Sequence, residues 1–396
     1  MVHTNDFRTR SVFFDTQNTT AADAWPIAID VGYSSVKGFS PNRIFAFPSY
    51  AKNMGSNPIL YGEPDANEIL YKDLETGEVW RVGRNAQQMV SERDTGDSQA
   101  ELFGRDRYFS KMFQVLIDTG LAFALLPNHA MARTDEPIYV QTGLPPAYLD
   151  EDKDLLIDTI AGEHHFAIKT AATRQYVTMN FSIDPENINV MSQPNGTLMS
   201  VAMDDNAKTI PDAKKYFQSN IVIFDAGFGT LDLFDIKNRS IGIMETFSEF
   251  GMREVLARCG KKIRDKMGVV IRPSAMQKFL EDGVVMIRKR SRNKIASSTE
   301  PFGDLLEEAS TEVCRDAIEK VMNVYSGLFD YDYLVLTGGT STAWEEQIRD
   351  YCSDMDHLLV ISGNVNRPDL DLIFTNVRGY YMYLINSLKR AAKKKA

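Results

Sequence analysis

Two segments of the chain repeat one pattern of residues that suits phosphate binding. The first, IAIDVGYSSVKGF, spans residues 27–39, and the second, IVIFDAGFGTLDLF, spans residues 221–234. In both, an apolar strand ends near an Asp, a Gly follows two positions later, and a hydroxyl residue follows three positions after that Gly. Asp30 and Asp225 are 195 positions apart (225 minus 30), close to half of the 396 residues. The repeat predicts two related halves, each with one such loop.

The residue types in these loops are those that hold a phosphate and a hydrated cation. Glycine frees a turn so that backbone N–H groups can converge on an anion. The aspartates suit Mg²⁺, which keeps several waters and takes only one or two carboxylates besides phosphate oxygens. Lys37 could reach a β- or γ-phosphate as a point charge. Two opposed loops would therefore bind a triphosphate and its Mg²⁺ from both sides. The alternative interpretation is a pair of hairpins with polar turns and no ligand.

A third motif, TGGTS, begins at Thr337, where an apolar strand ends. Its glycines would let a nucleotide approach the backbone, and the N-terminus of the following helix favours phosphate. We expect an adenosine site here. Trp344 and a helix that carries Arg253 and Arg258 could flank the base, although a core tryptophan and solvated arginines would explain the same residues.

The elements that position these motifs are strands that alternate with helices along the chain. This alternation indicates α/β layers with a mostly parallel sheet and hairpins at its edge. The expected elements are strands at 137–145, 166–170, 176–183 and 187–191, helices at 149–160, 249–266 and 304–325, a strand that leads into Gly338, and a C-terminal helix that opens near Gly379.

The composition is that of a folded globular protein with an acidic surface. Hydrophobic residues make up 43% of the chain and charged residues 25%, and the formal net charge is -10. This acidity argues against a surface that neutralises many nucleic-acid phosphates. The three cysteines are far apart in the sequence and indicate neither a disulfide framework nor a thiolate metal site. Because the sequence shows no signal peptide and no apolar run of ~20 residues, we expect a cytoplasmic protein without membrane contact.

These motifs, in this order, resemble those of the actin superfamily. The segments GLPPAYLDEDKDLLIDTIAGEHHFAI and FTNVRGYYMYL look most like the plasmid-segregating bacterial actins of the ParM and Alp group. The resemblance implies two related α/β domains, with five-stranded mixed sheets flanked by helices, around a central nucleotide cleft. After an extension at 1–24, it implies domain I at 25–185 plus 375–396 and domain II at 186–374.

The resemblance also implies a site for ATP or ADP with Mg²⁺. Asp30 and Asp225 would hold the metal through water. Gln193 falls where ParM-like proteins place a Glu and actin a Gln, so it would align the attacking water while Asp225 accepts its proton. The residues expected to bind the nucleotide are Asp30, Gly32, Tyr33, Ser34, Ser35, Lys37, Asp225, Gly227, Phe228, Gly229, Thr230, Asp232, Arg253, Gly338, Gly339, Thr340 and Trp344.

The implied function is a filament-forming ATPase that polymerises, slowly hydrolyses ATP and moves or segregates DNA. Its partners would be copies of itself and a DNA-binding adaptor on plasmid centromere-like DNA, with no direct nucleic-acid contact. A small-molecule kinase would use the same cleft and is the main alternative, because a fold does not determine a function. A chaperone-like nucleotide domain is disfavoured because the chain leaves no room for a substrate-binding domain.

Overall fold

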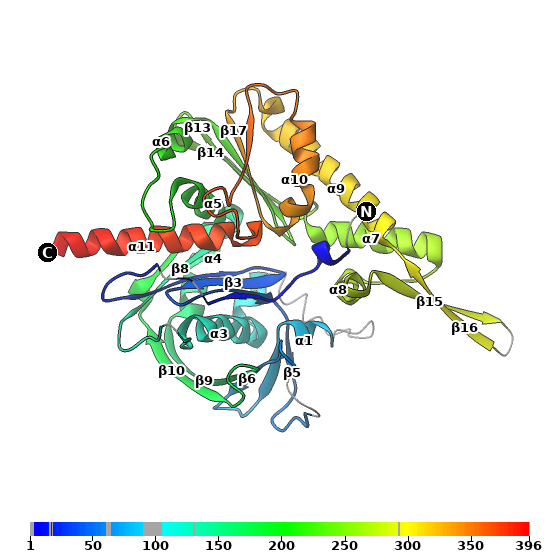
Figure 1. Ribbon diagram of the computed structural model, residues 1–396, viewed down its shortest axis with the longest axis horizontal. Helices are drawn as coiled ribbons and strands as arrows, with labels where there is room; N and C mark the ends of the chain where they lie inside the picture. The colour runs from blue at the N-terminus through cyan, green and yellow to red at the C-terminus, as the bar shows by residue number, and fades with distance from the viewer. Residues whose placement is uncertain are drawn as a thin grey trace.

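The computed structural model describes residues 4–15, 17, 19–60, 65–89, 105–129, 131–291 and 294–395. These residues form two α/β domains, one above the other in Figure 1, with the C-terminal helix extending to one side. Each domain has a central sheet with helices on both faces. Among the described residues, no helix combines the length and the apolar character that a bilayer crossing requires.

The main sheet of domain I has six strands in the order β1-β4-β3-β2-β8-β11. β8 runs parallel to both β2 and β11, whereas β1, β4, β3 and β2 pair antiparallel. The strands are β1 (Val12–Phe14), β2 (Trp25–Val31), β3 (Ser35–Ser40), β4 (Arg43–Pro48), β8 (Ile138–Leu144) and β11 (Ile188–Ser192).

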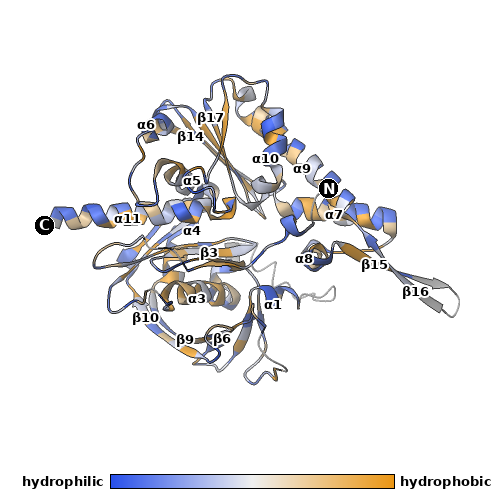
Figure 2. Cartoon of the chain, in the orientation of Figure 1, coloured by the Kyte–Doolittle hydropathy of each residue, from blue (hydrophilic) through white to orange (hydrophobic). Residues whose placement is uncertain are grey.

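Helix α3 (Lys111–Leu125) lies between this sheet and a second one, which explains why it is apolar all round and largely orange in Figure 2. Its one buried carboxylate, Asp118, accepts hydrogen bonds from Tyr71 and Gln114 and pairs with His164 at 2.8 Å. The second sheet has the order β10-β9-β6-β7-β5. Its strands and the nearby helices are β5 (Ala51–Asn53), β6 (Ile69–Asp73), β7 (Val79–Val82), β9 (Gly162–Thr170), β10 (Val177–Ile183), α1 (Arg84–Gln87) and α4 (Leu149–Ile160).

The sheet of domain II has five strands in the order β14-β13-β12-β17-β18. Its strands are β12 (Ile221–Ala226), β13 (Leu231–Lys237), β14 (Ser240–Phe247), β17 (Tyr333–Thr337) and β18 (Leu359–Ser362). One face packs against α7, α9 and α10, with a core around Trp344 and Phe224. The remaining elements are α6 (Ala213–Gln218), α7 (Met252–Met267), α8 (Pro273–Asp282), α9 (Gly303–Val324), α10 (Gly339–Tyr351) and the hairpin of β15 (Val284–Ser291) and β16 (Lys294–Pro301).

Two helices connect the domains and pack on each other. α5 (Gln193–Ala202) covers the domain II sheet, and α11 (Thr375–Lys395) covers the domain I sheet. They cross where Gly379 meets Gly196, and a Cβ on Gly379 would overlap the Gly196 carbonyl. Glycine at both positions therefore lets the two backbones touch, which ties the domains together at this crossing.

The domain boundaries differ from the expected ones in two places. β1, in the expected extension, pairs with β4 and makes the sheet six-stranded instead of five-stranded. β11 pairs with β8, so the domain I sheet continues past residue 185. Both differences are edge strands with short apolar patterns, and only pairing shows which sheet such a strand joins.

Candidate nucleotide site

The first loop joins β2 to β3 and places a lysine against an aspartate. Asp30 and Lys37 are direct partners across the two strands, and Lys37 Nζ lies 2.8 Å from Asp30 Oδ2. The turn is closed by a hydrogen bond from Gly32 N–H to the Ser35 carbonyl at 3.1 Å. Ser49 Oγ donates to the Gly32 carbonyl at 2.8 Å. The loop is therefore held in one shape, with its ion pair facing the space between the domains.

The second loop, between β12 and β13, repeats this geometry in domain II. Gly227 N–H donates to the Thr230 carbonyl at 2.8 Å, the equivalent of the Gly32–Ser35 bond 195 residues earlier (227 minus 32). Asp225 and Asp232 are direct cross-strand partners, so an aspartate stands where the first loop has Lys37. The repeat seen in the sequence is thus a repeat of backbone structure.

The two loops touch each other across the cleft. A Cβ on Gly229 would lie 2.6 Å from the ring of Tyr33, so a larger residue there would displace that ring. On the domain I side, the guanidinium of Arg107 lies over the Tyr33 ring, 5.1 Å from its centre. Loops that meet in this way can enclose a phosphate chain from two sides.

The Gly-Gly motif lies beside the second loop, where β17 leads into α10. Gly338 has φ +88° and ψ 154°, a conformation that is essentially restricted to glycine. A Cβ there would lie 2.3 Å from the Ala226 carbonyl and 2.6 Å from Asp225 Oδ1. Thr340 Oγ1 donates to the Gly227 carbonyl at 2.7 Å. The N-terminus of α10 is thereby fixed against the phosphate-type loop.

The N-termini of the two connecting helices supply polar groups to the cleft. Gln193 is the first residue of α5, and Asn376 is near the start of α11. Asn376 Nδ2 donates to Asp225 Oδ2 at 2.6 Å, and its own Oδ1 accepts from Thr197 at 2.6 Å. This chain of hydrogen bonds fixes the orientation of the Asp225 carboxylate.

The cleft brings together the expected residues from both loops, from the Gly-Gly motif and from α5. Those that line it are Asp30, Gly32, Tyr33, Ser34, Ser35, Lys37, Gln193, Asp225, Gly227, Phe228, Gly229, Thr230, Asp232, Gly338, Gly339 and Thr340. They surround a cavity of about 270 Å³.

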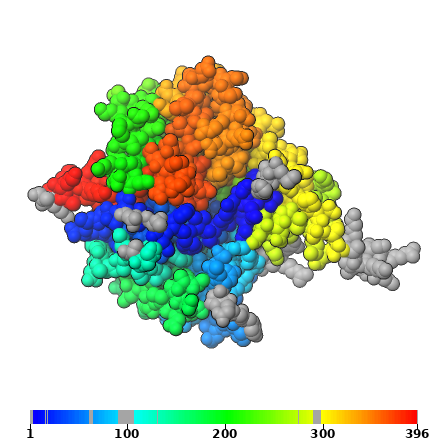
Figure 3. Space-filling model, in the orientation of Figure 1, coloured from blue at the N-terminus to red at the C-terminus, as the bar shows by residue number. Residues whose placement is uncertain are grey.

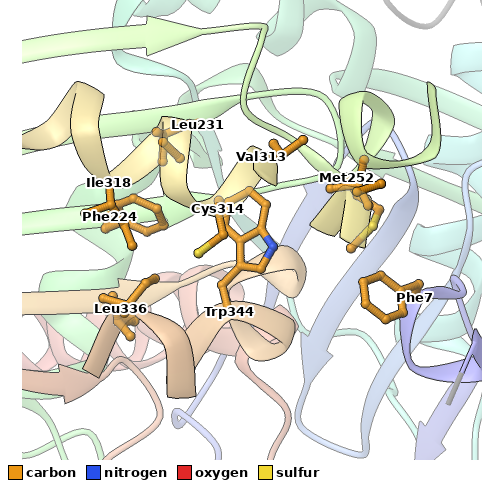
Figure 4. Packing of buried hydrophobic residues seen from close by; sticks show 14 of the residues in the cluster. Phe7, Phe224, Leu231, Met252, Val313, Cys314, Ile318, Leu336 and Trp344 are labelled. Carbon is orange, nitrogen blue, oxygen red and sulfur yellow. The ribbon is translucent and has the colours of Figure 1, made fainter. Parts of the chain in front are cut away.

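Trp344 and Arg253 are not among the residues that line the cleft. The Trp344 side chain is fully buried in the domain II core (Figure 4). Its indole N–H donates to Ser310 Oγ at 3.0 Å. Arg253 contributes its backbone N–H to the Phe228 carbonyl at 2.9 Å. The structure therefore does not support a place beside the base for either side chain. Helical periodicity alone does not reveal which face of α10 turns inward.

The comparisons with known proteins bear on the fold that carries this cleft. Residues 28–196 match the family described as "Actin like proteins N terminal domain". This segment is therefore similar to the N-terminal domain of actin-like proteins. No curated protein sequence matches the chain.

Solved structures of actin-like proteins have a similar fold over most of the chain. The ParM protein of a 15-stranded filament from Clostridium botulinum is 19% identical, with a TM-score of 0.65 over 91% of this chain and 99% of that one. Alp7A is 14% identical, with a TM-score of 0.62 over 94% and 99%. An archaeal actin homologue in complex with ADP is 17% identical, with a TM-score of 0.57 over 94% and 100%. The expected actin-like fold is confirmed.

The cleft of this actin-like chain contains residues that the motifs did not reveal. Asn376, Arg107 and the segment from Asp6 to Arg10 all line it. Asn376 lies in FTNVRGYYMYL, which carried part of the resemblance. Its position near the start of the C-terminal helix could have marked it as a residue of the cleft. No local pattern connects the N-terminal segment to a loop more than 200 residues away.

The charge pattern of the cleft suits a hydrated divalent cation. Asp30 and Asp225 are both nearly buried and line the same cavity. In the described parts of the chain, no group of three or more His, Cys, Asp and Glu side chains is placed to hold a metal by itself. Mg²⁺ would accordingly take its other ligands from water and phosphate, as this ion commonly does.

Burial shifts the acidity of two carboxyl groups in the cleft. It raises the pKa of Asp225 from 3.8 to about 6, against the opposing effects of the Asn376 hydrogen bond and the Lys37 charge. It raises the pKa of Asp232 from 3.8 to about 7, and the negative charge of Asp225 adds to this effect. Thr246 and Thr230 oppose it by donating hydrogen bonds to Asp232. Both carboxyl groups therefore keep a proton at mildly acidic pH values where an exposed aspartate is ionised.

We expect the nucleotide-free protein to lose stability as the pH rises from about 4 to about 7. The folded chain binds these two protons more tightly than the unfolded chain, so their contribution is complete below about pH 4 and is lost as the pH rises through about 7. Asp232→Asn should weaken this dependence and raise the Tm at pH 8, measured by thermal unfolding. Asp235→Asn, a buried aspartate of the same strand that bonds Tyr331, is the control. A pH dependence unchanged by Asp232→Asn would contradict this account.

Proposed function

We propose that this chain is an ATP-dependent, filament-forming actin homologue that slowly hydrolyses ATP to move or segregate DNA. The observation that carries the proposal is the pair of matched loops that meet across one cleft, each with an aspartate at its base. The fold shared with a ParM filament protein supports the self-assembly part. The fold shared with an ADP-bound actin homologue supports the nucleotide part.

In this proposal, the loops orient the triphosphate and the connecting helices supply the groups for hydrolysis. Lys37 balances phosphate charge, and backbone N–H groups of the two loops bind phosphate oxygens. Mg²⁺, when bound near Asp30 and Asp225, would neutralise further charge on the triphosphate. Asp225, with a pKa of about 6, is acidic enough to be ionised at neutral pH and basic enough to accept a proton from water. Asn376 holds that carboxylate in place.

Gln193 aligns the attacking water in this scheme, because an amide can donate and accept hydrogen bonds but is a poor base. We expect Gln193→Ala to lower the rate of phosphate release from ATP by about tenfold or more, measured by a coupled phosphate assay. Gln193→Glu should retain at least the rate of the unaltered protein, since a carboxylate can also bind water. Gln347→Ala, on α10 and outside the cleft, is the control. Equal rates for the Ala variants at 193 and 347 would remove Gln193 from the mechanism.

The acidic surface bears on the proposed DNA cargo. With a net charge of -10, the chain would be repelled by a phosphate backbone. We therefore assign the DNA contact to a basic adaptor protein bound to plasmid DNA. The cytoplasm, where ATP and plasmids are both found, is the corresponding location.

Sedimentation with Mg-ATP tests the proposal against the kinase alternative. Filaments of a protein with one contact surface at each end grow by head-to-tail addition, so pelleted protein should appear above a threshold concentration with ATP. Light scattering should rise and phosphate should be released afterwards. A protein that stays monomeric across a wide concentration range while it phosphorylates a sugar or acetate would be a kinase, and the filament proposal would be wrong.

A further inference from the structure

The N-terminal segment is anchored to domain II at its first residues. We call residues 4–15 the N-terminal strap; its first turn is the 3₁₀ helix Thr4–Phe7. Thr4 Oγ1 donates to the Leu280 carbonyl at 2.8 Å, and Thr9 N–H donates to Gln277 Oε1 at 3.0 Å. Both acceptors belong to α8. The Phe7 side chain is 6% exposed and joins the domain II core near Met252 (Figure 4).

The other end of the strap belongs to domain I. Val12–Phe14 form β1, which pairs antiparallel with β4. Asp15 binds Arg43, the first residue of β4, at 2.8 Å. The Phe13 ring packs against Phe123 of α3, with centres 5.0 Å apart. The strap is thus fixed to one domain at each end, and Figure 3 shows the N-terminal part of the chain running between them.

Between its anchors, the strap lines the candidate nucleotide site. Asp6, Phe7, Arg8, Thr9, Arg10 and Val12 face the same cavity as the two phosphate-type loops. Met252, at the start of α7, lines the cavity beside them. In Figure 1 the first turn of the strap lies near α7 and α8, on the side of the cleft away from α5 and α11. A nucleotide between the loops would therefore meet the strap on that side.

One ion cluster links the strap to both domains. Glu281 of α8 binds Arg8 of the strap at 3.3 Å. The same carboxylate also binds Arg84 of α1, on domain I. Domain opening and release of the strap would both break contacts with Glu281, so the two events are coupled in this geometry.

We propose that the N-terminal strap forms one wall of the nucleotide site and controls the exit of bound nucleotide. Phe7 and Met252 give this wall an apolar surface suited to a base. Arg8 and Arg10 are each paired with a carboxylate, Glu281 and Asp6, and with Asp6 as the one strap carboxylate at the cavity they leave the strap's share of the wall net positive. The strap must leave α8, or the domains must separate, before a nucleotide dissociates. The inference rests on the proposed function to the extent that the cleft must bind a nucleotide.

A reversible cross-link tests this role in the full chain. A Cβ on Gly283 would lie 3.2 Å from Thr4 Oγ1, close enough for a disulfide between cysteines at the two positions. The native cysteines, Cys259, Cys314 and Cys352, are buried and would not compete. The Thr4→Cys/Gly283→Cys variant is loaded with fluorescent ATP and Mg²⁺, and dissociation is followed after addition of excess unlabelled ATP. The variants with one of the two cysteines are the controls.

We expect oxidation of the double variant to slow dissociation by about tenfold or more, and reduction to restore the original rate. Phe7→Ala should speed dissociation by about tenfold, because the strap loses its buried anchor. Phe217→Ala, an exposed phenylalanine outside the cleft, should leave the rate unchanged. Labelled ATP that binds but dissociates equally fast from the oxidised and reduced forms would overturn the strap proposal alone. No binding of labelled ATP to the unaltered chain would overturn the proposed function, and the strap proposal with it.

Discussion

Asp225→Asn should slow phosphate release from ATP by about 100-fold or more while leaving the assembly of filaments with ATP intact. The substitution keeps the shape of the side chain and an acceptor for Asn376, but an amide cannot take a proton from the attacking water. Loss of a positioned general base usually costs two to four orders of magnitude. Phosphate release and sedimentation, measured on the same sample, separate hydrolysis from assembly.

Asp235→Asn is the matched control for this experiment. Asp235 is also a buried aspartate of the domain II sheet, but it binds Tyr331 at 2.7 Å and does not line the cleft. It should leave hydrolysis within a factor of about two of the unaltered rate. Phosphate release that is unchanged in Asp225→Asn would remove this residue from the mechanism.

Gly338→Ala should weaken ATP binding by about 100-fold, which corresponds to about 2.7 kcal/mol. The new methyl group would meet the Ala226 carbonyl at 2.3 Å and Asp225 Oδ1 at 2.6 Å. One of these is backbone of the central strand, so the loop must move. Its φ of +88° and ψ of 154° also lie where alanine is strongly disfavoured. Titration with fluorescent ATP measures the loss.

Gly268→Ala separates crowding in the cleft from the general cost of losing a glycine. Gly268 ends α7 with φ +71° and ψ 15°, in the left-handed helical region, and a Cβ there would meet nothing within 4 Å. That replacement should cost about 1 kcal/mol of stability and leave ATP affinity unchanged. Equal losses of affinity in the two variants would mean that Gly338 has no special role in binding.

The site could be predicted from sequence where its geometry is local. Asp30, Gly32 and Ser35 lie within six residues, so one hairpin positions them, and the same hairpin recurs at Asp225. Each loop is closed by its own backbone hydrogen bond, which needs no information from the rest of the chain. The repeat therefore predicted both the two-domain fold and the location of the cleft.

Features that depend on distant packing could not be predicted in this way. Trp344 follows the Gly-Gly motif closely in sequence, but α10 turns it into the core against Phe224. The strap reaches the cleft because Phe7 enters the domain II core, which forms from residues beyond position 220. The polar composition of residues 1–24 gave no sign of this burial, because the phenylalanines at 7, 13 and 14 form no periodic pattern.

Cryo-electron microscopy of the full chain with Mg-ATP is the most direct test of the central claim. The account predicts filaments whose subunits hold nucleotide between the loops at Gly32 and Gly227, with Gly338 beside it and the N-terminal strap alongside. Monodisperse single particles at concentrations where the cleft is saturated with ATP would contradict it.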